Sequence, residues 1–325
     1  MIPRISRPVL KVAAITLTAG IWGSYAFAQP DGYLLEANVI YREVEGVKLR
    51  LDLYHPSEQE GPHPALLLFH GGGWNAGNRA MMGALGQSAA ARGYLAAVVS
   101  YRLTNETGTD GKPKYVFPDP VHDVKAAVRW LRENATRLQI NPDRIGVVGE
   151  SAGGHLALMV GLVGPEDGLE PDTPSANADP LVIADAKPVS TRVAVVVNMF
   201  GPTELVSGFE TSEGGKDWIR EFIGGRPEEM PERYRAASPL TYVSTDDPPI
   251  LTLHGRGDRL VPVQQALQLE RACRNAEVSH QLIVVETAGH GFKGRDLRRV
   301  RKEMFLFLDS HLRPTTGPKP HPEWN

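Results

Sequence analysis

The sequence lacks several features on which whole classes of protein depend. It contains one cysteine, Cys273, so no disulfide can form within the chain. It also has no Cys/His metal-binding cluster and no phosphate-binding loop of the pattern G-x-x-x-x-G-K-[ST]. These absences argue against a metal centre or a nucleotide site, and we expect that no cofactor is needed. With 325 residues, 42% of them hydrophobic, the chain can bury a hydrophobic core of ordinary size without disulfides or metal ions to stabilise it.

Positive charge is also scarce. The chain has 35 Lys and Arg residues against 38 Asp and Glu residues, which gives a formal net charge of -3. Residues 1–28 contain three of the basic residues and no acidic one, so the rest of the chain carries 32 basic against 38 acidic side chains. This balance argues against a nucleic-acid partner.

The N-terminal segment lacks a hydrophobic run of membrane-spanning length. Its basic start is followed by an apolar run of 12 residues at Val12–Gly23, whereas a spanning helix needs about 20. Ala26-Phe27-Ala28 then matches an A-x-A cleavage pattern. We therefore predict that residues 1–28 are a signal peptide, and not a retained anchor. The mature protein would be periplasmic or secreted, without stable membrane insertion.

Short apolar runs alternate with segments of helical spacing along the rest of the chain. Residues 38–44 and 47–54 alternate around Gly46 and predict a β-hairpin. Further runs, nearly continuous in Leu, Val, Ile and Ala, are typical of strands buried on both faces of a parallel sheet. They lie at 65–69, 94–100, 145–149, 193–200, 249–254 and 281–286. Helix candidates lie at 80–92, 119–139, 152–163, 263–275 and 295–312. This order predicts an α/β fold with an eight-stranded, mostly parallel sheet and helices on both faces.

No shift in composition divides the chain, so we predict a single catalytic domain over residues 29–313 and a flexible tail over 314–325. Three stretches, 104–118, 164–190 and 201–242, fit neither the helical nor the strand period. Long irregular segments in a compact domain are usually functional or mobile. We expect them to be lid-like insertions.

The run Gly149-Glu150-Ser151-Ala152-Gly153 matches the pattern G-x-S-x-G. It follows a predicted buried strand and opens a predicted helix, which is the setting of a nucleophile elbow. We interpret Ser151 as a nucleophile at a helix N-terminus, where the local field favours an anion. The alternative is a glycine-rich turn in which Ser151 only caps the helix.

The run His70-Gly71-Gly72-Gly73-Trp74 follows the predicted strand at 65–69. A glycine-rich motif at this place supplies one backbone N–H to an oxyanion hole, and the residue after the nucleophile supplies the other. The candidates are Gly72, Gly73 and Ala152; a flexible turn is the alternative. The side chain of Trp74 is expected to form a wall on the acyl side of the substrate pocket. The alternative is that Trp74 only packs its loop against the sheet. We expect segments 104–118 and 201–242 to supply the remaining walls.

An acid and a base follow the serine along the chain. Asp258 comes just after the strand at 249–254, at the carboxyl edge of the predicted sheet, where catalytic groups collect. His290 stands between two glycines after the last strand. The order Ser151, Asp258, His290 is that of the catalytic triad in α/β-hydrolases. The alternatives are a turn aspartate and a loop histidine. We expect structural roles for the other histidines near these motifs, His70, His155 and His254.

The run Gly-Glu-Ser-Ala-Gly-Gly-His-Leu at 149–156, preceded by Asn-Pro-Asp-Arg-Ile at 141–145, resembles the BD-FAE type of α/β-hydrolase, the bifunctional feruloyl and acetyl-xylan esterases. Further similar stretches are Asp-Val-Lys-Ala-Ala-Val-Arg-Trp-Leu at 123–131, Ser-Pro-Leu at 238–240, Pro-Pro at 248–249, residues 258–262 and Gly-His-Gly-Phe at 289–292. The resemblance covers roughly residues 39–312. It implies an α/β-hydrolase fold and an esterase.

The motifs together predict acyl transfer, in which His290 takes the proton of Ser151 and Asp258 orients the imidazole. The expected substrate is a small-molecule or carbohydrate-linked ester with a short-chain, acetyl or feruloyl group. Two alternatives stay open. The first is an amidase or peptidase of the same fold, and the second is a non-catalytic binding protein. No pattern in the sequence indicates the oligomeric state.

Overall fold

The structure is a computed structural model that describes residues 26–28, 32–57, 61–171 and 189–313. The predicted tail at 314–325, most of segment 164–190 and all but the last three residues of the predicted signal peptide lie outside the described residues. Export therefore stays a prediction. No helix within the described ranges combines the length and the apolar character needed to cross a bilayer.

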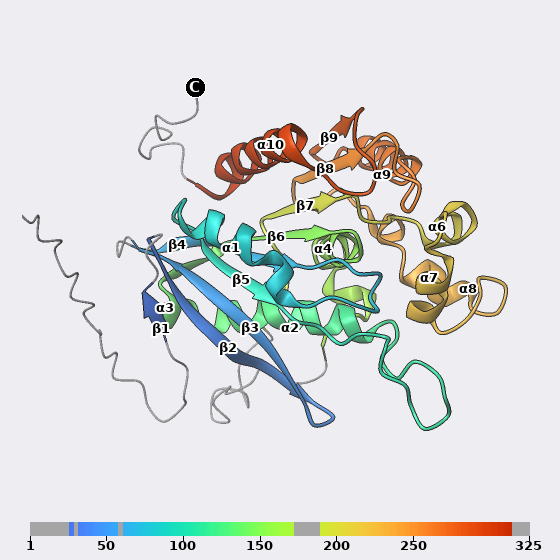
Figure 1. Ribbon diagram of the computed structural model, residues 1–325, viewed down its shortest axis with the longest axis horizontal. Helices are drawn as coiled ribbons and strands as arrows, with labels where there is room; N and C mark the ends of the chain where they lie inside the picture. Colours follow the sequence, from blue (N-terminus) through green and yellow to red (C-terminus); the bar gives the residue numbers. More distant parts are fainter. Residues whose placement is uncertain (1–25, 29–31, 58–60, 172–188, 314–325) are drawn as a thin grey trace, which may run out of the picture.

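The core of the molecule is one twisted sheet with the strand order β1-β2-β3-β5-β4-β6-β7-β8-β9 (Figure 1). Its strands are β1 (Ala26–Ala28), β2 (Tyr33–Val44), β3 (Val47–Pro56), β4 (His63–Phe69), β5 (Leu95–Val99), β6 (Ile140–Glu150), β7 (Val195–Met199), β8 (Ile250–Gly255) and β9 (His280–Val285). The pairs β1–β2, β2–β3 and β3–β5 are antiparallel, and all pairs from β5 to β9 are parallel. The eight predicted strands are present, and the three-residue β1 adds a ninth at the edge.

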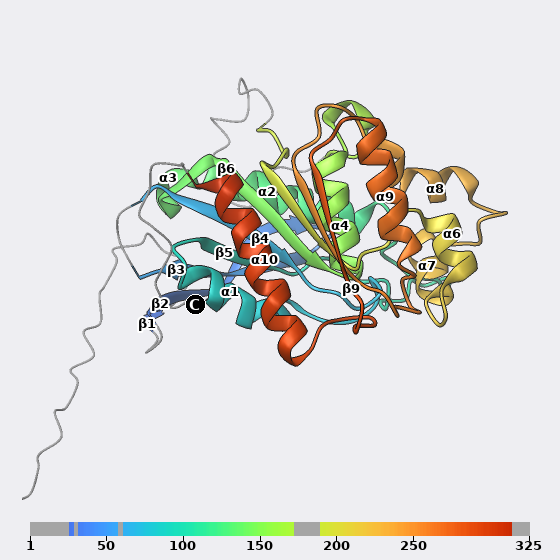
Figure 2. The same ribbon diagram turned by 90° about the horizontal axis from the view of Figure 1, so that it is seen from above.

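Helices cover both faces of the sheet, as Figure 2 shows. They are η1 (Arg79–Met82), α1 (Gly83–Ala90), α2 (Asp119–Glu133), α3 (Ala135–Leu138), α4 (Ala152–Leu162), η2 (Pro165–Asp167), α6 (Leu205–Thr211), α7 (Lys216–Ile223), α8 (Pro231–Ala236), η3 (Pro239–Tyr242), α9 (Gln264–Asn275) and α10 (Gly294–Leu312). Helices α1 and α10 pack on one face, and α2, α4 and α9 pack on the other. The helix predicted at 119–139 is divided at Asn134, whose side-chain amide donates to the carbonyl of Trp130.

Strand β4 shows why the predicted strands are continuously apolar. Ala65, Leu67 and Phe69 pack in the core on the α2 and α4 side, whereas Leu66 and Leu68 pack in the core on the α1 and α10 side. Because successive side chains of a strand point to opposite faces, a strand covered on both sides needs apolar residues at every position.

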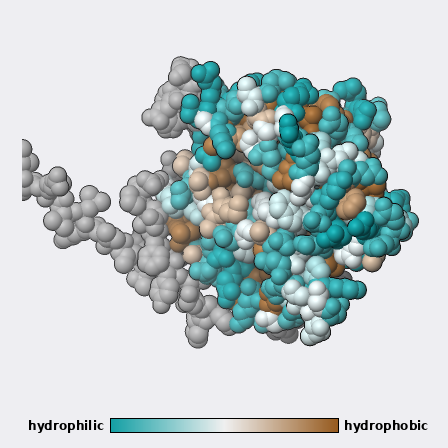
Figure 3. Space-filling view, turned by 45° about the vertical axis from the view of Figure 1, so that its right-hand side comes forward, coloured by the Kyte–Doolittle hydropathy of each residue, from teal (hydrophilic) through white to brown (hydrophobic). Residues whose placement is uncertain are grey.

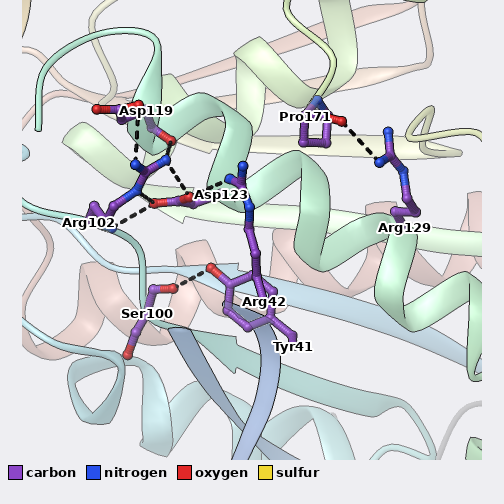
Figure 4. A network of polar contacts seen from close by, with 8 residues as sticks. All are labelled: Tyr41, Arg42, Ser100, Arg102, Asp119, Asp123, Arg129 and Pro171. Atoms are coloured by element: carbon purple, nitrogen blue, oxygen red, sulfur yellow. Dashed lines mark hydrogen bonds and ion pairs between the residues drawn. The ribbon is translucent and has the colours of Figure 1, made fainter. Parts of the chain in front are cut away.

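A buried ion network ties the antiparallel hairpin to helix α2 (Figure 4). Asp123 of α2 is fully buried and accepts from Arg42 of β2 at 2.6 Å and from the Nε of Arg102 at 2.9 Å. Asp119 pairs with the same guanidinium of Arg102 at 3.3 Å. Two buried cations thus face two carboxylates, which satisfies charges that would be costly to bury alone. The network fixes the start of the loop that follows β5.

Segment 201–242, here called the cap, contains α6, α7, α8 and η3. Figure 1 shows α6, α7 and α8 grouped beyond the carboxyl ends of the parallel strands. Segment 104–118 has no helix or strand, only an isolated bridge between Thr107 and Pro113. In the view of Figure 3 most of the described surface is hydrophilic, with smaller hydrophobic patches. The large hydrophobic side chains exposed among the described residues are Met81, Trp218 and Leu306.

Candidate active site

Ser151 lies in a sharp turn between β6 and α4. Its backbone angles, φ 54° and ψ −119°, lie in a region that residues other than glycine rarely adopt. A Cβ on Gly149 would stand 1.9 Å from the carbonyl oxygen of Gly153, and one on Gly153 would stand 2.2 Å from the carbonyl oxygen of Phe69. Both glycines of the G-x-S-x-G pattern are therefore required, because a larger side chain at either position would clash with the backbone. The backbone N–H of Ser151 donates to the carbonyl of Met199 at 2.8 Å, which fixes the turn against β7.

The structure brings the serine together with the predicted acid and base. His290 Nε2 lies 2.9 Å from Ser151 Oγ, and His290 Nδ1 lies 2.8 Å from Asp258 Oδ2. The other carboxylate oxygen, Oδ1, accepts from the backbone N–H groups of Leu260 at 3.0 Å and Val261 at 2.9 Å. When Nδ1 donates to Asp258, Nε2 is left free to accept the proton of Ser151. The side chain of Asp258 is buried, so this carboxylate cannot swing out to solvent.

Neighbouring rings hold this arrangement in place. Phe200, directly after β7, packs the edge of its ring against the imidazole of His290 at a centroid distance of 4.9 Å. It does so from a positive φ of 44°, a strained conformation for a phenylalanine. His254 Nε2 donates to the carbonyl of Val261 at 2.7 Å, and burial lowers the pKa of His254. A neutral His254 therefore supports the turn whose amides hold Asp258.

His155 joins three parts of the site. It is fully buried in α4, donates from Nε2 to the carbonyl of Ala237 in the cap at 2.7 Å, and accepts at Nδ1 from the indole N–H of Trp74 at 3.3 Å. Burial lowers the pKa of His155 to about 4. His70, also buried, stacks on Tyr101 at 4.4 Å. Both histidines are placed as structural supports, the role expected for them from the sequence.

A partly open pocket lies beside Ser151. Gly73 and Ala152 line it, together with Trp218 of α7 and Leu260 of the loop after β8. As the first residue of α4, Ala152 has an N–H that no carbonyl within the helix accepts. Gly72, the third oxyanion-hole candidate, is not part of the lining. Among the described residues, no cluster of three or more His, Cys, Asp or Glu side chains could hold a metal ion.

Trp74 lines the cavity and also packs its loop. Its side chain is only 3% exposed and stacks on Phe222 of α7 at 4.3 Å. The cap supplies much of the wall, as expected, but the prediction that segment 104–118 supplies another part is wrong. Phe117 donates its backbone N–H to the carbonyl of Phe222 and packs edge-on against that ring, so the segment lies behind α7. Residues 260–262 provide the wall instead.

Neither Trp218 nor Leu260 could be singled out as a wall residue from the sequence, although Trp218 lies in a segment predicted to supply part of the wall. Trp218 projects from an eight-residue helix and lies directly over Gly73, because a Cβ on that glycine would stand 2.6 Å from the indole ring. Leu260 follows Asp258 by two positions in an irregular turn. The hydrophobic residue at 218 was the available signal, but a short helix gives too few positions to show which side chain faces inward.

The fold and the site together define an α/β-hydrolase. The sheet is mostly parallel, the serine lies in a strand–turn–helix elbow, and an aspartate and a histidine follow the serine in that order along the chain. Residues 51–273 match the model of the BD-FAE family. The chain belongs to this family, and the resemblance drawn from the motifs is confirmed.

Curated relatives and solved structures agree with this assignment. Esterase LipC of Mycobacterium tuberculosis is 30% identical over 71% of this chain and 53% of its own length. The probable carboxylic ester hydrolase LipM of the same organism is 28% identical over 72% of this chain and 50% of its own length. The chain thus spans about half the length of these curated relatives.

Two solved structures are matched over nearly their whole length. A thermophilic esterase from Thermogutta terrifontis superposes with a TM-score of 0.67 at 26% identity, covering 86% of this chain and 94% of that one. A truncated carbohydrate esterase from gut microbiota gives a TM-score of 0.69 at 26% identity, covering 88% and 99%. These likenesses extend over most of the described fold.

Proposed function

We propose that this protein is a serine hydrolase that cleaves carboxylic esters through an acyl-enzyme. The observation that carries the proposal is the continuous chain of hydrogen bonds from Ser151 through His290 to Asp258, which lies beside a pocket lined largely by apolar residues. Relatives and structural neighbours that are named as esterases support it.

The geometry supports a balanced two-step reaction. His290 Nε2 removes the proton of Ser151 Oγ as this oxygen attacks the ester carbonyl, and Asp258 stabilises the imidazolium that forms. In this proposal the backbone N–H groups of Ala152 and Gly73, which both line the pocket, donate to the developing oxyanion. The proton on His290 then passes to the leaving alcohol. In the second step His290 takes a proton from water, whose oxygen attacks the acyl carbonyl and releases the acid and free Ser151.

The proposed substrates are esters of short acyl groups, including acyl groups carried on carbohydrates. The pocket beside Ser151 is lined by the rings of Trp74 and Trp218 and by Leu260, so it suits a small apolar group. The likeness to the carbohydrate esterase from gut microbiota supports the carbohydrate part of the proposal.

A matched set of substrates tests the reaction class. We expect rapid release of p-nitrophenol from p-nitrophenyl acetate and butyrate, with an initial burst of one equivalent where deacylation is slower than acylation. The anilides of the same acids should react far more slowly, because an amine is a poorer leaving group than a phenol. Acetylated xylan and methyl ferulate extend the set to carbohydrate-linked and aromatic acyl esters. Equal kcat/KM on ester and anilide would favour an amidase. Neither burst nor turnover on any ester would favour a binding protein.

We propose that Trp74 limits the size of the acyl group. Trp74→Ala should change the ratio of kcat/KM for hexanoate and acetate esters in favour of hexanoate, by roughly 10- to 200-fold, because removing a pocket wall relaxes size discrimination. The assay compares p-nitrophenyl hexanoate with p-nitrophenyl acetate. The melting temperature should also fall, since the indole stacks on Phe222 and donates to His155.

Phe222→Ala is the matched control, since Phe222 is the stacking partner of Trp74 but does not line the cavity. It should lower the melting temperature and leave the ratio near the wild-type value. The same ratio change in both variants, or none in Trp74→Ala, would assign Trp74 a packing role alone.

A further inference from the structure

The outward side of the first turns of α10 is densely positive. Four exposed cations lie there at positions i, i+3, i+4 and i+7, the spacing that places side chains on one side of a helix. They are Arg295, Arg298, Arg299 and Lys302, here called the basic stripe. Among the described residues, none of the four side chains has a hydrogen bond or an ion pair to another protein group. The basic stripe therefore presents unpaired positive charge to solvent.

This charge contrasts with the rest of the chain. Residues 293–302 contain six basic residues and one acidic residue, whereas the other residues of 29–325 contain 26 basic against 37 acidic side chains. An anionic polymer is repelled by an excess of negative charge and attracted to a local excess of positive charge. The basic stripe therefore determines where on the molecule such a polymer can bind.

The stability of α10 does not explain the basic stripe. Arg295 and Arg298 lie near the N-terminus of the helix, where the helix dipole favours acidic side chains. Arg295 and Arg299 are four positions apart, as are Arg298 and Lys302, and like charges at this spacing destabilise a helix. A bound polyanion would relieve both effects, because it places negative charge beside the four cations.

The basic stripe is held close to the proposed general base. Arg295 follows His290 by only five positions, which limits the separation of their Cα atoms to roughly 18 Å. The hydroxyl of Thr287, on the loop that carries His290, donates to Oδ2 of Asp296 in the first turn of α10 at 2.7 Å. This hydrogen bond ties the start of the helix to that loop, so a polymer bound to the basic stripe lies near the triad.

The buried side of α10 argues against a lipid surface as the partner. A helix that lies on a membrane inserts its apolar side into the lipid. The apolar side of α10 is instead packed in the core on the sheet, through Val300, Met304, Phe305, Phe307, Leu308 and Leu312. A polymer of acidic sugars needs no free apolar side, and arginine binds carboxylates through paired hydrogen bonds.

We propose that the basic stripe binds an acidic polysaccharide, whose uronate carboxylates pair with the four cations, and holds the polymer with its acyl ester groups near Ser151. The inference rests on the proposed function, and it narrows the proposed carbohydrate-linked esters to those carried on anionic polymers. The binding step involves no bond cleavage, so it is measured apart from catalysis.

Binding is measured by isothermal titration calorimetry on full-length Ser151→Ala, with polygalacturonate as the anionic probe and glucomannan as the uncharged one. Replacing all four cations of the basic stripe by Gln should raise the dissociation constant for polygalacturonate at least about tenfold at low ionic strength, because the attraction between opposite charges is lost. In about 1 M NaCl, where charges are screened beyond roughly 3 Å, the two proteins should bind polygalacturonate equally weakly. Glucomannan should bind more weakly than polygalacturonate at low ionic strength.

The matched control removes four exposed cations from other parts of the surface. These are replaced by Gln at Lys48, Lys112, Arg226 and Arg271. This control has the same net charge as the stripe variant, and its dissociation constant should change less than about threefold. Both variants should keep their melting temperatures within a few degrees, since all the substitutions are at the surface.

Three results would overturn the proposal. The first is an unchanged dissociation constant in the stripe variant, and the second is an equal loss of binding in the control. The third is tighter binding of Ser151→Ala to vesicles of phosphatidylglycerol and phosphatidylcholine than to polygalacturonate, with the difference lost in the stripe variant. That result would assign the basic stripe to a lipid surface.

Cleavage is measured with Ser151 intact. The ratio of kcat/KM for acetylated pectin to that for acetylated glucomannan should fall about tenfold in the stripe variant, mainly through KM, because the four cations bind the polymer and do not touch the reacting atoms. A protein that binds polygalacturonate but cleaves no ester would contradict the proposed function alone. A protein that cleaves p-nitrophenyl acetate but binds polygalacturonate no better than glucomannan would contradict this inference alone.

Discussion

Ser151→Ala should lower ester turnover by about 10⁴- to 10⁶-fold, because it removes the oxygen proposed to attack the ester carbonyl. The remaining rate would come from binding and from the oxyanion donors acting on water. The protein should stay folded. Alanine keeps the Cβ of Ser151, and among the described residues the only side-chain hydrogen bond found for the serine is the one to His290. The strained backbone at this position is present in both proteins, so it does not change their relative stability.

The measurement is kcat/KM on p-nitrophenyl acetate beside the melting temperature of each protein. A labelled fluorophosphonate, followed by peptide mass spectrometry, should modify the wild type at Ser151 and leave Ser151→Ala unlabelled. Ser310→Ala makes the same chemical change at an exposed position of α10 and should retain full activity. If pure Ser151→Ala kept more than about a tenth of the wild-type rate, another residue would have to be the nucleophile.

The parts of the site that could be predicted from the sequence are those set by local geometry. The elbow occupies five consecutive residues, and the steric conflict at Gly149 and Gly153 shows why glycine is needed at both ends of the motif. The positions of Asp258 and His290 followed from the order of strands, because each comes just after a strand that ends at the same edge of the sheet. The fold thus joins Ser151 to His290 across 139 positions of sequence.

The parts that could not be predicted depend on long-range packing. Phe200 packs against His290, and its backbone has a positive φ. No side-chain pattern in the sequence predicts this backbone conformation for a phenylalanine. The cap helices α6, α7 and α8 have six to eight residues each, too short for a period to reveal that Trp218 faces the cavity. Segment 104–118 was expected at the wall, but Phe117 packs behind Phe222 and supports the wall from outside.

Asp258→Asn should lower kcat by about 10³- to 10⁴-fold with little change in stability. Oδ1 of Asp258 accepts two backbone N–H groups, from Leu260 and Val261. An asparagine must keep its oxygen at that place, because an NH₂ group there would face two donors. Its NH₂ group is then directed at Nδ1 of His290, where the aspartate oxygen Oδ2 now lies at 2.8 Å.

Two N–H donors cannot share one hydrogen bond, so in this variant Nδ1 must be the acceptor and the proton of the neutral ring must move to Nε2. Nε2 faces Ser151 Oγ at 2.9 Å, and a protonated Nε2 cannot take up the proton of the serine. The defect is one of tautomer and charge, with the shape of the site preserved. Fluorophosphonate labelling should therefore slow by a factor similar to the fall in kcat, while the melting temperature stays within a few degrees.

Asp296→Asn is a matched control for this change. Asp296 accepts from the hydroxyl of Thr287, on the loop that carries His290, but makes no contact with His290 that is seen among the described residues. The control should lose less than about half of the activity, because surface substitutions of this kind change free energies by only a few tenths of a kcal/mol.

If Asp258→Asn retained more than about a tenth of wild-type kcat, the tautomer of His290 would have to be set by another group. Among the described residues the remaining candidate would be His254, whose Nε2 lies 3.5 Å from Asp258 Oδ2. However, His254 already donates from that nitrogen to the carbonyl of Val261 at 2.7 Å, and its lowered pKa keeps it uncharged, so it carries no charge to replace that of the aspartate.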